Sequence, residues 1–163
     1  MKMEFPQGFM GFWYVGEEPV SRIDVSEFRA LCYAVARQLG GTVSGFRFAS
    51  TLGNFHSATL HWDYDRKTAD ILCNCHHWII AFAKPRSDRD WFLEFLDYPE
   101  IAVLVRSMWK YRVLTKMELE TLITDDHLDA MAPTDRKMIA KGKRAGLLGK
   151  PLTIGDVVFH FLD

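Results

Sequence analysis

The chain has 163 residues, of which 48% are hydrophobic and 25% are charged, and its formal net charge is −1. This composition is typical of a folded globular protein, and the length suits a single domain over residues 1–163 with its own core. The charge gives the whole chain no electrostatic preference for nucleic acid or anionic membranes. No apolar run approaches the ~20 residues of a membrane-spanning helix.

The first residues and the cysteine count predict a location. The start, MKMEFPQGFMGFWYVGEE, lacks a long apolar region and carries Glu4 early, unlike a secretory signal. Three cysteines cannot all pair with one another, which favours free thiols. We therefore expect a cytoplasmic protein.

Residues 5–15 combine seven large apolar side chains with neighbouring glycines at 8, 11 and 16. Glycine weakens a helix, so we expect an irregular or short extended segment. Two interpretations of its aromatic residues stay open. They either cover a sheet or form a partly exposed patch that grips a partner.

Residues 24–39 have the pattern of an amphipathic helix. Asp24 and Glu27 resemble a capping box at its start, and Gly40-Gly41 supplies an end. One apolar stripe follows helical spacing and should pack on one face of the sheet; it comprises Val25, Phe28, Leu31, Cys32, Val35 and Leu39.

Residues 42–84 predict an antiparallel meander of about four strands. Ala58, Leu60, Trp62 and Tyr64 alternate with polar residues, as in a strand with one buried face. The run 78–83 is apolar on both faces, which indicates an internal strand covered on both sides. Turns are expected at 53–54 and 65–67, and Pro85 should end the last strand.

After Pro85 the spacing becomes helical, so the predicted class is α+β, with the meander packed by an N-terminal helix and a C-terminal helical half. For the last segment, residues 152–163, a strand is the alternative to a helix, because Val157, Phe159 and Phe161 also alternate. Helix starts are expected near Ser87 or Asp88 (a helix carrying Trp91, Phe92, Phe95 and Leu96), at Pro99, at Thr115 with Glu118, at Asp125-Asp126, at Pro133 and at Thr153.

Cys73, Cys75, His76 and His77 form the densest group of chemically active side chains. Cysteine and histidine ligate zinc, but a tetrahedral site needs four converging donors, and neighbours in a strand point apart. A nucleophilic cysteine activated by a histidine is a second possibility. The alternative is buried thiols at a strand end, and we expect no metal, no cofactor and no catalytic residue.

Two further groups have a functional and a plain interpretation. His61 with Asp63 and Asp65 could perform general-base chemistry or form a solvated strand face. The basic run Arg136–Lys150 could bind phosphates, dock an acidic protein, or be a solvated helix. Nucleic acid ranks last there, because the run has no GxxxxGK[ST] loop and no interleaved aromatic residues.

The common enzyme signatures HExxH, GxSxG, GxGxxG and paired CxxC are absent from the sequence. We therefore expect a binding protein rather than an enzyme.

The layout resembles a known class of proteins. The aromatic start, the helix at 24–39, the meander ending in HHWIIAFAKP, the FLDYPEIAVLV helix and the terminal GDVVFHFLD together resemble the small cytosolic immunity proteins of bacterial polymorphic-toxin systems. The resemblance implies a domain that binds and blocks a cognate toxin. Many such inhibitors are acidic, whereas this chain is near neutral, so a nucleic-acid-cleaving target is not implied.

The predicted function is thus a protein-binding module, as an immunity protein. The alternatives are a small metal- or thiol-dependent enzyme centred on Cys73, Cys75, His76 and His77, and a nucleic-acid-binding module using Arg136–Lys150. The expected partner surface is the polar face and turn ends of the sheet with the aromatic start, namely Trp13, Tyr14, His61, Asp63, Asp65, His76 and His77.

Overall fold

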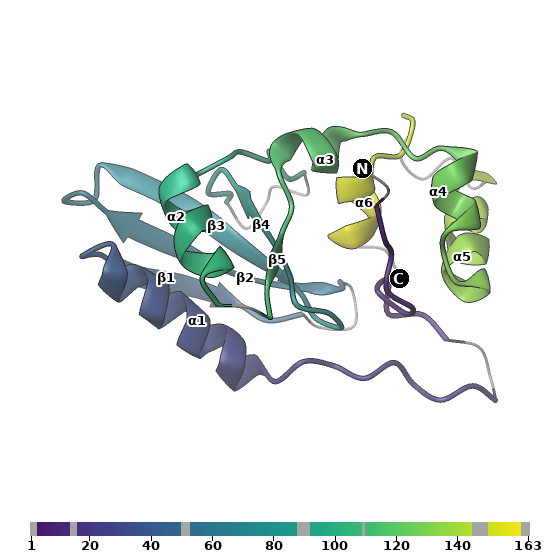
Figure 1. Cartoon of the computed structure of the whole chain (residues 1–163), viewed down its shortest axis with the longest axis horizontal. Coiled ribbons are helices and arrows are strands. Elements are labelled where there is room, and N and C mark those ends of the chain that lie inside the picture. The colour runs from purple at the N-terminus through teal and green to yellow at the C-terminus, as the bar shows by residue number, and fades with distance from the viewer. Residues whose placement is uncertain are drawn as a thin grey trace.

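A five-stranded sheet forms the centre of the molecule (Figure 1). The computed structural model describes residues 3–13, 16–49, 53–87, 92–108, 110–144 and 150–160. In chain order the elements are α1 (Val25–Gln38), β1 (Thr42–Arg47), β2 (Phe55–Trp62), β3 (Lys67–Asn74), β4 (Ile79–Ala83), α2 (Pro99–Arg106), β5 (Arg112–Val113), α3 (Lys116–Glu120), α4 (Asp125–Asp129), α5 (Pro133–Arg144) and α6 (Ile154–Val158). No helix in these ranges has the length and apolarity needed to cross a bilayer.

The predicted α+β class and the meander are confirmed. Strands β1 to β4 pair in chain order and are all antiparallel. A fifth strand was not predicted. β5 pairs in parallel with β4, Ile79 opposite Arg112 and Ile80 opposite Val113, after the crossover through α2. Two residues are too few to show an alternating pattern, which is why sequence reasoning missed β5.

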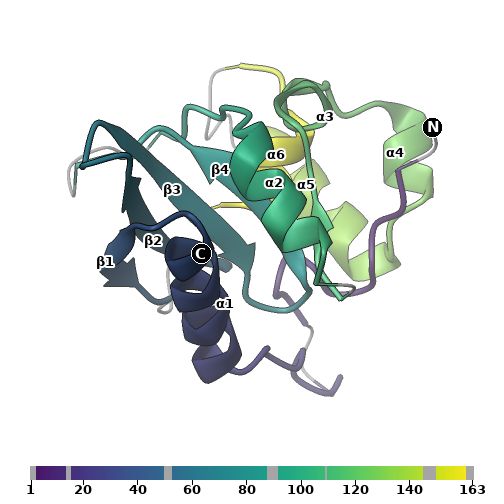
Figure 2. The same cartoon turned by 60° about the vertical axis from the view of Figure 1, so that its left-hand side comes forward.

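Both faces of the sheet are buried. Ala58, Leu60 and Trp62 of β2 belong to a core that also contains the inner side chains of α1 and α2. Leu72 of β3 and Ala81 of β4 belong to a second core, with residues from the N-terminal segment, α3 and α6. The cartoon shows α1 and α2 together on one side, and α4 and α5 at the end away from β1 (Figures 1 and 2).

The helix α1 begins and ends where the sequence predicts. Asp24 caps it by accepting a hydrogen bond from Ser26 N, at 2.8 Å, without the reciprocal bond of a capping box. Gly40 then adopts φ +65°, a conformation that favours glycine. A side chain at Gly41 would collide with the backbone of His61, so this glycine lets the chain enter β1 close against β2.

The described part of the helix predicted after Ser87 is extended, so that prediction is wrong there. Leu96 N donates to Phe82 O at 3.1 Å, and Lys84 N donates to Glu94 O at 2.9 Å. These bonds cover the outer edge of β4 beyond β5, while Phe95 is buried in the second core. Pairing with a free strand edge outweighs local helical spacing. Trp91 lies outside the described residues.

The other predicted helix starts are confirmed with small changes. Pro99 is in the first turn of α2, and Thr115 with Glu118 forms the capping box of α3. The cap of α4 is Thr124 rather than Asp125. Thr153 caps α6, so its segment is a helix, not a strand, up to Val158.

Tyr64 is not on the buried face of β2, as its alternation suggested. It lies in the turn at 63–66, with φ +54° and 94% of its surface exposed.

The N-terminal segment covers the second core. Phe9 and Met10 are buried, and Phe5 and Phe12 pack against the same core. The covering interpretation is therefore confirmed for these residues. Trp13 remains 49% exposed.

Two buried asparagines tie both chain ends to the sheet. Asn74 Nδ2 donates to Phe9 O and to Val158 O, each at 2.9 Å. Asn54 Nδ2 donates to the same two carbonyls, at 3.1 and 3.0 Å, and its Oδ1 accepts from His160 N at 2.7 Å. The amides thus supply hydrogen bonds to the irregular backbone at Phe9 and to the last carbonyl of α6, which a helix leaves without an internal partner.

We predict that Asn74→Ala lowers the free energy of unfolding by about 3 kcal/mol, because His76 N and His77 N lose their acceptor and two buried carbonyls each lose one of their two amide donors. Urea unfolding measures the change. The control Gln38→Ala removes an exposed amide at the end of α1 and should change stability by less than about 0.5 kcal/mol. Equal effects of the two substitutions would contradict the assigned role of Asn74.

Candidate functional site

The Cys/His group does not converge on one point. Cys73 is buried in the core beneath α1, and Cys75 is buried as well. The His76 ring bonds Ser21 O through Nδ1, and the His77 ring bonds Gln7 O through Nε2, each at 2.9 Å. Within the described ranges no three His, Cys, Asp or Glu side chains are placed to hold a metal ion. The two histidines fasten the N-terminal segment to the sheet end.

The thiols are unsuited to nucleophilic chemistry. All three cysteines are free and buried. Desolvation raises the pKa of Cys73 well above its ordinary value and raises that of Cys75 as well. The thiolate is the reactive form, so both groups are protonated and unreactive at neutral pH.

His61 does not form a catalytic pair with the neighbouring acids. Its Nε2 lies 2.8 Å from Ser44 Oγ on the adjacent strand. Asp63 and Asp65 are exposed and adopt positive φ in the turn between β2 and β3. The interpretation as a solvated strand end fits these positions.

The partner surface predicted from the sequence is divided by the sheet. His61 pairs with Thr68 at one end of β3, whereas His76 and His77 follow its other end. Because a strand rises about 3.3 Å per residue, the two ends are roughly 25 Å apart. Trp13 follows Gly11, which abuts the His76 ring, and Tyr14 lies outside the described residues. The seven residues therefore do not form one surface.

Two residues of the basic run are paired with acids in the part that the structure describes. Arg136 pairs with Asp129 at 3.8 Å, and Lys150 pairs with Asp156 at 3.7 Å. Asp135 points inward, where its Oδ2 accepts from Gly8 N at 3.0 Å and burial raises its pKa. The side chains of 142–149 lie outside the described residues.

A different surface stands out on the outer side of α1 and β1. We define the aromatic–arginine surface as Arg29, Tyr33, Arg37, Phe46 and Phe48. The Phe46 and Phe48 rings stack with centroids 5.9 Å apart, and Tyr33 lies 5.7 Å from Phe46. The Arg29 guanidinium covers Phe48 at 4.9 Å and Phe46 at 5.5 Å. Tyr33 is 53% and Phe48 is 37% exposed.

Only part of this surface was visible in the sequence. Arg29, Tyr33 and Arg37 recur every four residues, which places them on one exposed face of α1. Phe46 and Phe48 share a face by alternation. The packing of α1 on β1 brings the helix residues and the two phenylalanines together, and the sequence pattern does not specify this packing.

His56 supports the surface from below. Its ring lies 5.8 Å from Phe48 and 5.9 Å from Phe28, and Nδ1 accepts from Ala49 N at 2.8 Å. Desolvation, together with the positive charge of Arg22, lowers the pKa of His56 to about 4. The ring is therefore neutral at physiological pH and holds residues 48–49 in place.

The edge of β1 disfavours recognition by strand addition. The pairing with β2 shifts between Ser44 and Arg47, and Gly45 adopts φ +60°. A bulge of this kind interrupts the row of outward backbone groups that an added strand needs. Contacts with a partner would therefore come from side chains.

Arg47 points to the other face of β1, toward a buried acid. Asp70, fully buried in β3, accepts from Thr59 Oγ1 at 2.6 Å and lies 4.0 Å from Arg47 Nη1. Desolvation raises the pKa of Asp70. An aspartate between the apolar Ala69 and Ile71 of β3 is the sequence signal for this contact, which anchors β1 from behind.

Comparison of the chain with protein-family models, with curated proteins and with solved structures finds no match.

We predict that Cys73 and Cys75 react slowly with a neutral-pH thiol reagent in the native protein. Access requires local opening, and an opening that costs about 3 kcal/mol slows labelling by about a hundredfold relative to a free thiol. Mass spectrometry of quenched samples measures the rates, and denatured protein is the control. Labelling at the rate of free cysteine would revive the thiol-enzyme alternative.

We predict that the free energy of unfolding falls as the pH drops from about 6.5 to 4, partly through His56. In that window the unfolded histidine binds a proton and the native one does not, so each pH unit costs up to about 1.4 kcal/mol. His76, whose pKa burial also lowers, acts in the same direction.

Chemical unfolding at pH 7 and pH 5 tests this dependence. His56→Gln keeps an acceptor for Ala49 N without titrating and should flatten the slope. An imidazole NMR titration of native His56 with a midpoint near 6.5 would refute the prediction.

Proposed function

We propose that this chain is a protein-binding module that acts as an immunity protein, binding and neutralising a cognate bacterial toxin. The observation that carries the proposal is the aromatic–arginine surface. The resemblance in layout supplies the biological setting.

The composition of this surface is that of a protein-binding hot spot. Tyrosine and arginine are enriched among residues that dominate binding energy, and aromatic rings offer large contact areas at a small cost in conformational entropy. The contacts of Arg29 with Phe46 and Phe48 already order its guanidinium before a partner arrives. This preorganisation reduces the entropy lost on binding.

The charge of the surface favours an acidic partner. Arg29 and Arg37 are exposed and form no ion pair within the ranges that the structure describes. Glu27, on the same helix, is paired with Lys110 beside α2 and β5. An acidic patch with apolar neighbours on the toxin, about 800 Å² in area, would complement this side of the molecule.

Nucleic acid is the less favoured ligand for the same surface. Binding of single strands uses free aromatic faces on which bases stack. Here Arg29 covers the Phe48 ring, and the Phe46 and Phe48 rings stack on one another. These contacts cover ring faces on which a base would have to stack.

Co-expression with the product of the neighbouring gene tests the proposal. We expect the two proteins to co-purify and growth inhibition by that product to be relieved. Tyr33→Ala and Arg29→Glu should each weaken binding by about thirtyfold, in line with a hot-spot loss of about 2 kcal/mol. The exposed Tyr64, in the turn between β2 and β3, provides the control Tyr64→Ala, which should leave the affinity unchanged.

Three outcomes would count against the proposal. The absence of both binding and protection would contradict the immunity role. A loss of binding with Tyr64→Ala but not with Tyr33→Ala would move the interface to the turn between β2 and β3. Salt-sensitive binding of a single-stranded oligonucleotide that Arg29→Glu abolishes would reassign the surface to nucleic acid.

A further inference from the structure

A hollow of about 460 Å³ lies beside α1, between this helix and the chain that follows α2. Its size is within the range of ligand pockets. We define the α1 groove as this hollow between Ala30 and Ala34 of α1 on one side and Met108 and Tyr111 on the other.

The interior of the α1 groove is apolar. Leu31 and Tyr111, which also line it, are buried in the core beneath α1, and Met108 packs against the same core. Ala30 is exposed and Ala34 is half-buried, so packing of α1 on the sheet does not account for the small side chain at position 30. Two alanines one turn apart let another element approach the helix closely.

The charges at the α1 groove neutralise each other. Glu27 and Lys110 are the charged residues of its described lining, and Lys110 Nζ donates to Glu27 Oε2. The ammonium also lies 4.4 Å from the ring centroid of Trp78 and 5.4 Å from that of Tyr111. These contacts hold Lys110 in place and leave the groove suited to an uncharged, apolar group.

The α1 groove adjoins the aromatic–arginine surface along the helix. Residues three and four positions apart on a helix are neighbours, with about 5–6 Å between their Cβ atoms. Ala30 therefore lies beside Tyr33, and Ala34 lies beside Arg37. The solvent side of α1 thus combines an apolar hollow with Arg29 and Arg37, which form no ion pair among the residues that the structure describes.

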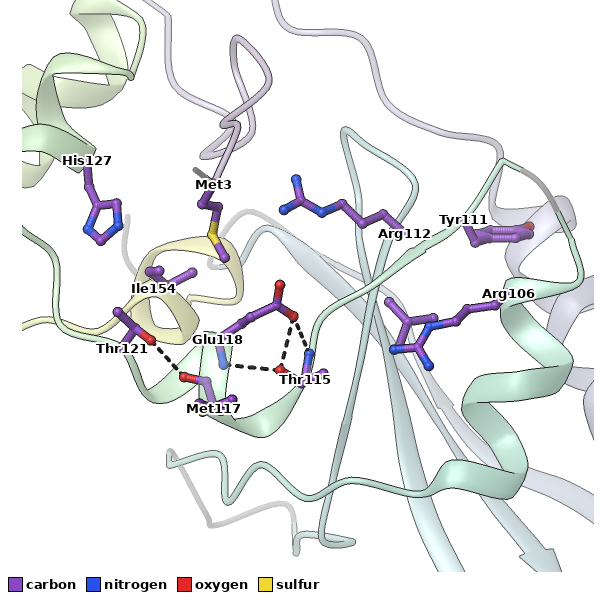
Figure 3. A pocket seen from close by; sticks show the side chains of 11 residues that line it. Met3, Arg106, Tyr111, Arg112, Thr115, Met117, Glu118, Thr121, His127 and Ile154 are labelled. Carbon is purple, nitrogen blue, oxygen red and sulfur yellow. Dashed lines mark hydrogen bonds between the residues drawn. The ribbon is translucent and has the colours of Figure 1, made fainter. Parts of the chain in front are cut away.

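A larger pocket, of about 690 Å³, lies elsewhere, against β5 and α3 (Figure 3). Its lining includes Arg112 of β5, Glu118 of α3 and Ile154 of α6 (Figure 3). None of its described lining residues comes from α1, so it does not extend the aromatic–arginine surface. The α1 groove is the hollow that a protein bound to that surface would reach.

We propose that the α1 groove receives an apolar side chain from an acidic amphipathic helix of the partner protein. This inference rests on the proposed function, since the partner is the protein that the aromatic–arginine surface binds. A leucine or phenylalanine of the helix enters the groove, and carboxylates of the same helix face Arg29 and Arg37.

A helix is the element that suits this position. Alanine at positions 30 and 34 permits two helix axes to approach to about 8 Å, the short end of the usual range. The bulge between Ser44 and Arg47 disfavours a strand added to β1, as described above.

Binding of the neighbouring gene's product to groove-filled variants tests the inference. Ala30→Trp places a large ring in the groove from an exposed position and should weaken binding at least about tenfold, because the anchor side chain then has no room. The matched control is Met117→Trp, which adds the same ring at an exposed position of α3, in the larger pocket. It should leave the affinity unchanged, and urea unfolding checks that both variants keep the fold.

The variants separate this inference from the proposed function. Binding that is lost with Arg29→Glu but survives Ala30→Trp would overturn the role of the groove and leave the proposed function standing. A loss of binding with Met117→Trp but not with Ala30→Trp would assign the anchor to the larger pocket and also overturn the inference.

A peptide probe tests the α1 groove without the partner. The probe is a capped helix-forming peptide of ~14 residues, composed of leucine, alanine and glutamate, titrated into the full chain. We expect backbone NMR shifts at Ala30, Ala34 and Met108, and their loss in Ala30→Trp. A matched peptide with lysine in place of glutamate should bind more weakly, because Arg29 and Arg37 repel it.

Three results with the probe would overturn the inference. The first is the absence of shifts at the groove, and the second is equal binding of the glutamate and lysine peptides. The third is binding of N-acetylleucinamide as tight as that of the glutamate peptide, which would assign the hollow to a small apolar molecule. If the neighbouring gene's product does not bind the unaltered chain, the proposed function fails, and the peptide titration alone decides what the groove accepts.

Discussion

The structure depends on the hydrogen bonds of Asn54 and Asn74. The two amides bond Phe9 O and Val158 O, so one point beside β2 and β3 holds both the N-terminal segment and the end of α6. The N-terminal segment is irregular and supplies few hydrogen bonds to itself. Without these side chains its buried carbonyl would stay unpaired, at a cost comparable to a lost hydrogen bond. The N-terminal segment can cover the second core because the two amides supply this hydrogen bond at the sheet.

Burial of both sheet faces determines where recognition can occur. Because α1 and α2 cover one face and the chain ends cover much of the other, the inner strands of the sheet offer few accessible side chains. The aromatic–arginine surface adjoins β1, the first edge strand. An open pocket lined by residues of β5, α3 and the end of α2 adjoins β5, the last one. The Cys/His turn, which looked most reactive in the sequence, contributes instead to attachment of the N-terminal segment.

Local chemistry was predictable from the sequence, and long-range pairing was not. Alternation in β2 and the caps at Asp24, Thr115 and Thr153 act within a few residues, so their patterns are legible. The extended segment around Phe95 and the strand β5 form because β4 offers them an edge, a fact outside their own sequence.

The structure separates residues of the expected partner surface for a related reason. His61 and His76 are close in the chain, but β3 runs between them and carries them to opposite ends of the sheet. Residues 29 and 48 are farther apart, yet the turn at Gly40-Gly41 reverses the chain and brings them together. Sequence distance therefore does not show which side chains lie together, because the direction of each element decides which side chains meet.

The charge of the aromatic–arginine surface has a consequence for recognition. Arginine stays protonated at any physiological pH, and the histidine below the surface is neutral because burial and Arg22 disfavour its charged form. The surface therefore keeps its positive charge unchanged between about pH 6 and 8. Protonation of His56 would break its bond from Ala49 N and release Phe48 from below, but only at a pH that also destabilises the fold. The proposed binding of an acidic partner by these side chains should therefore be insensitive to pH for as long as the domain is stable.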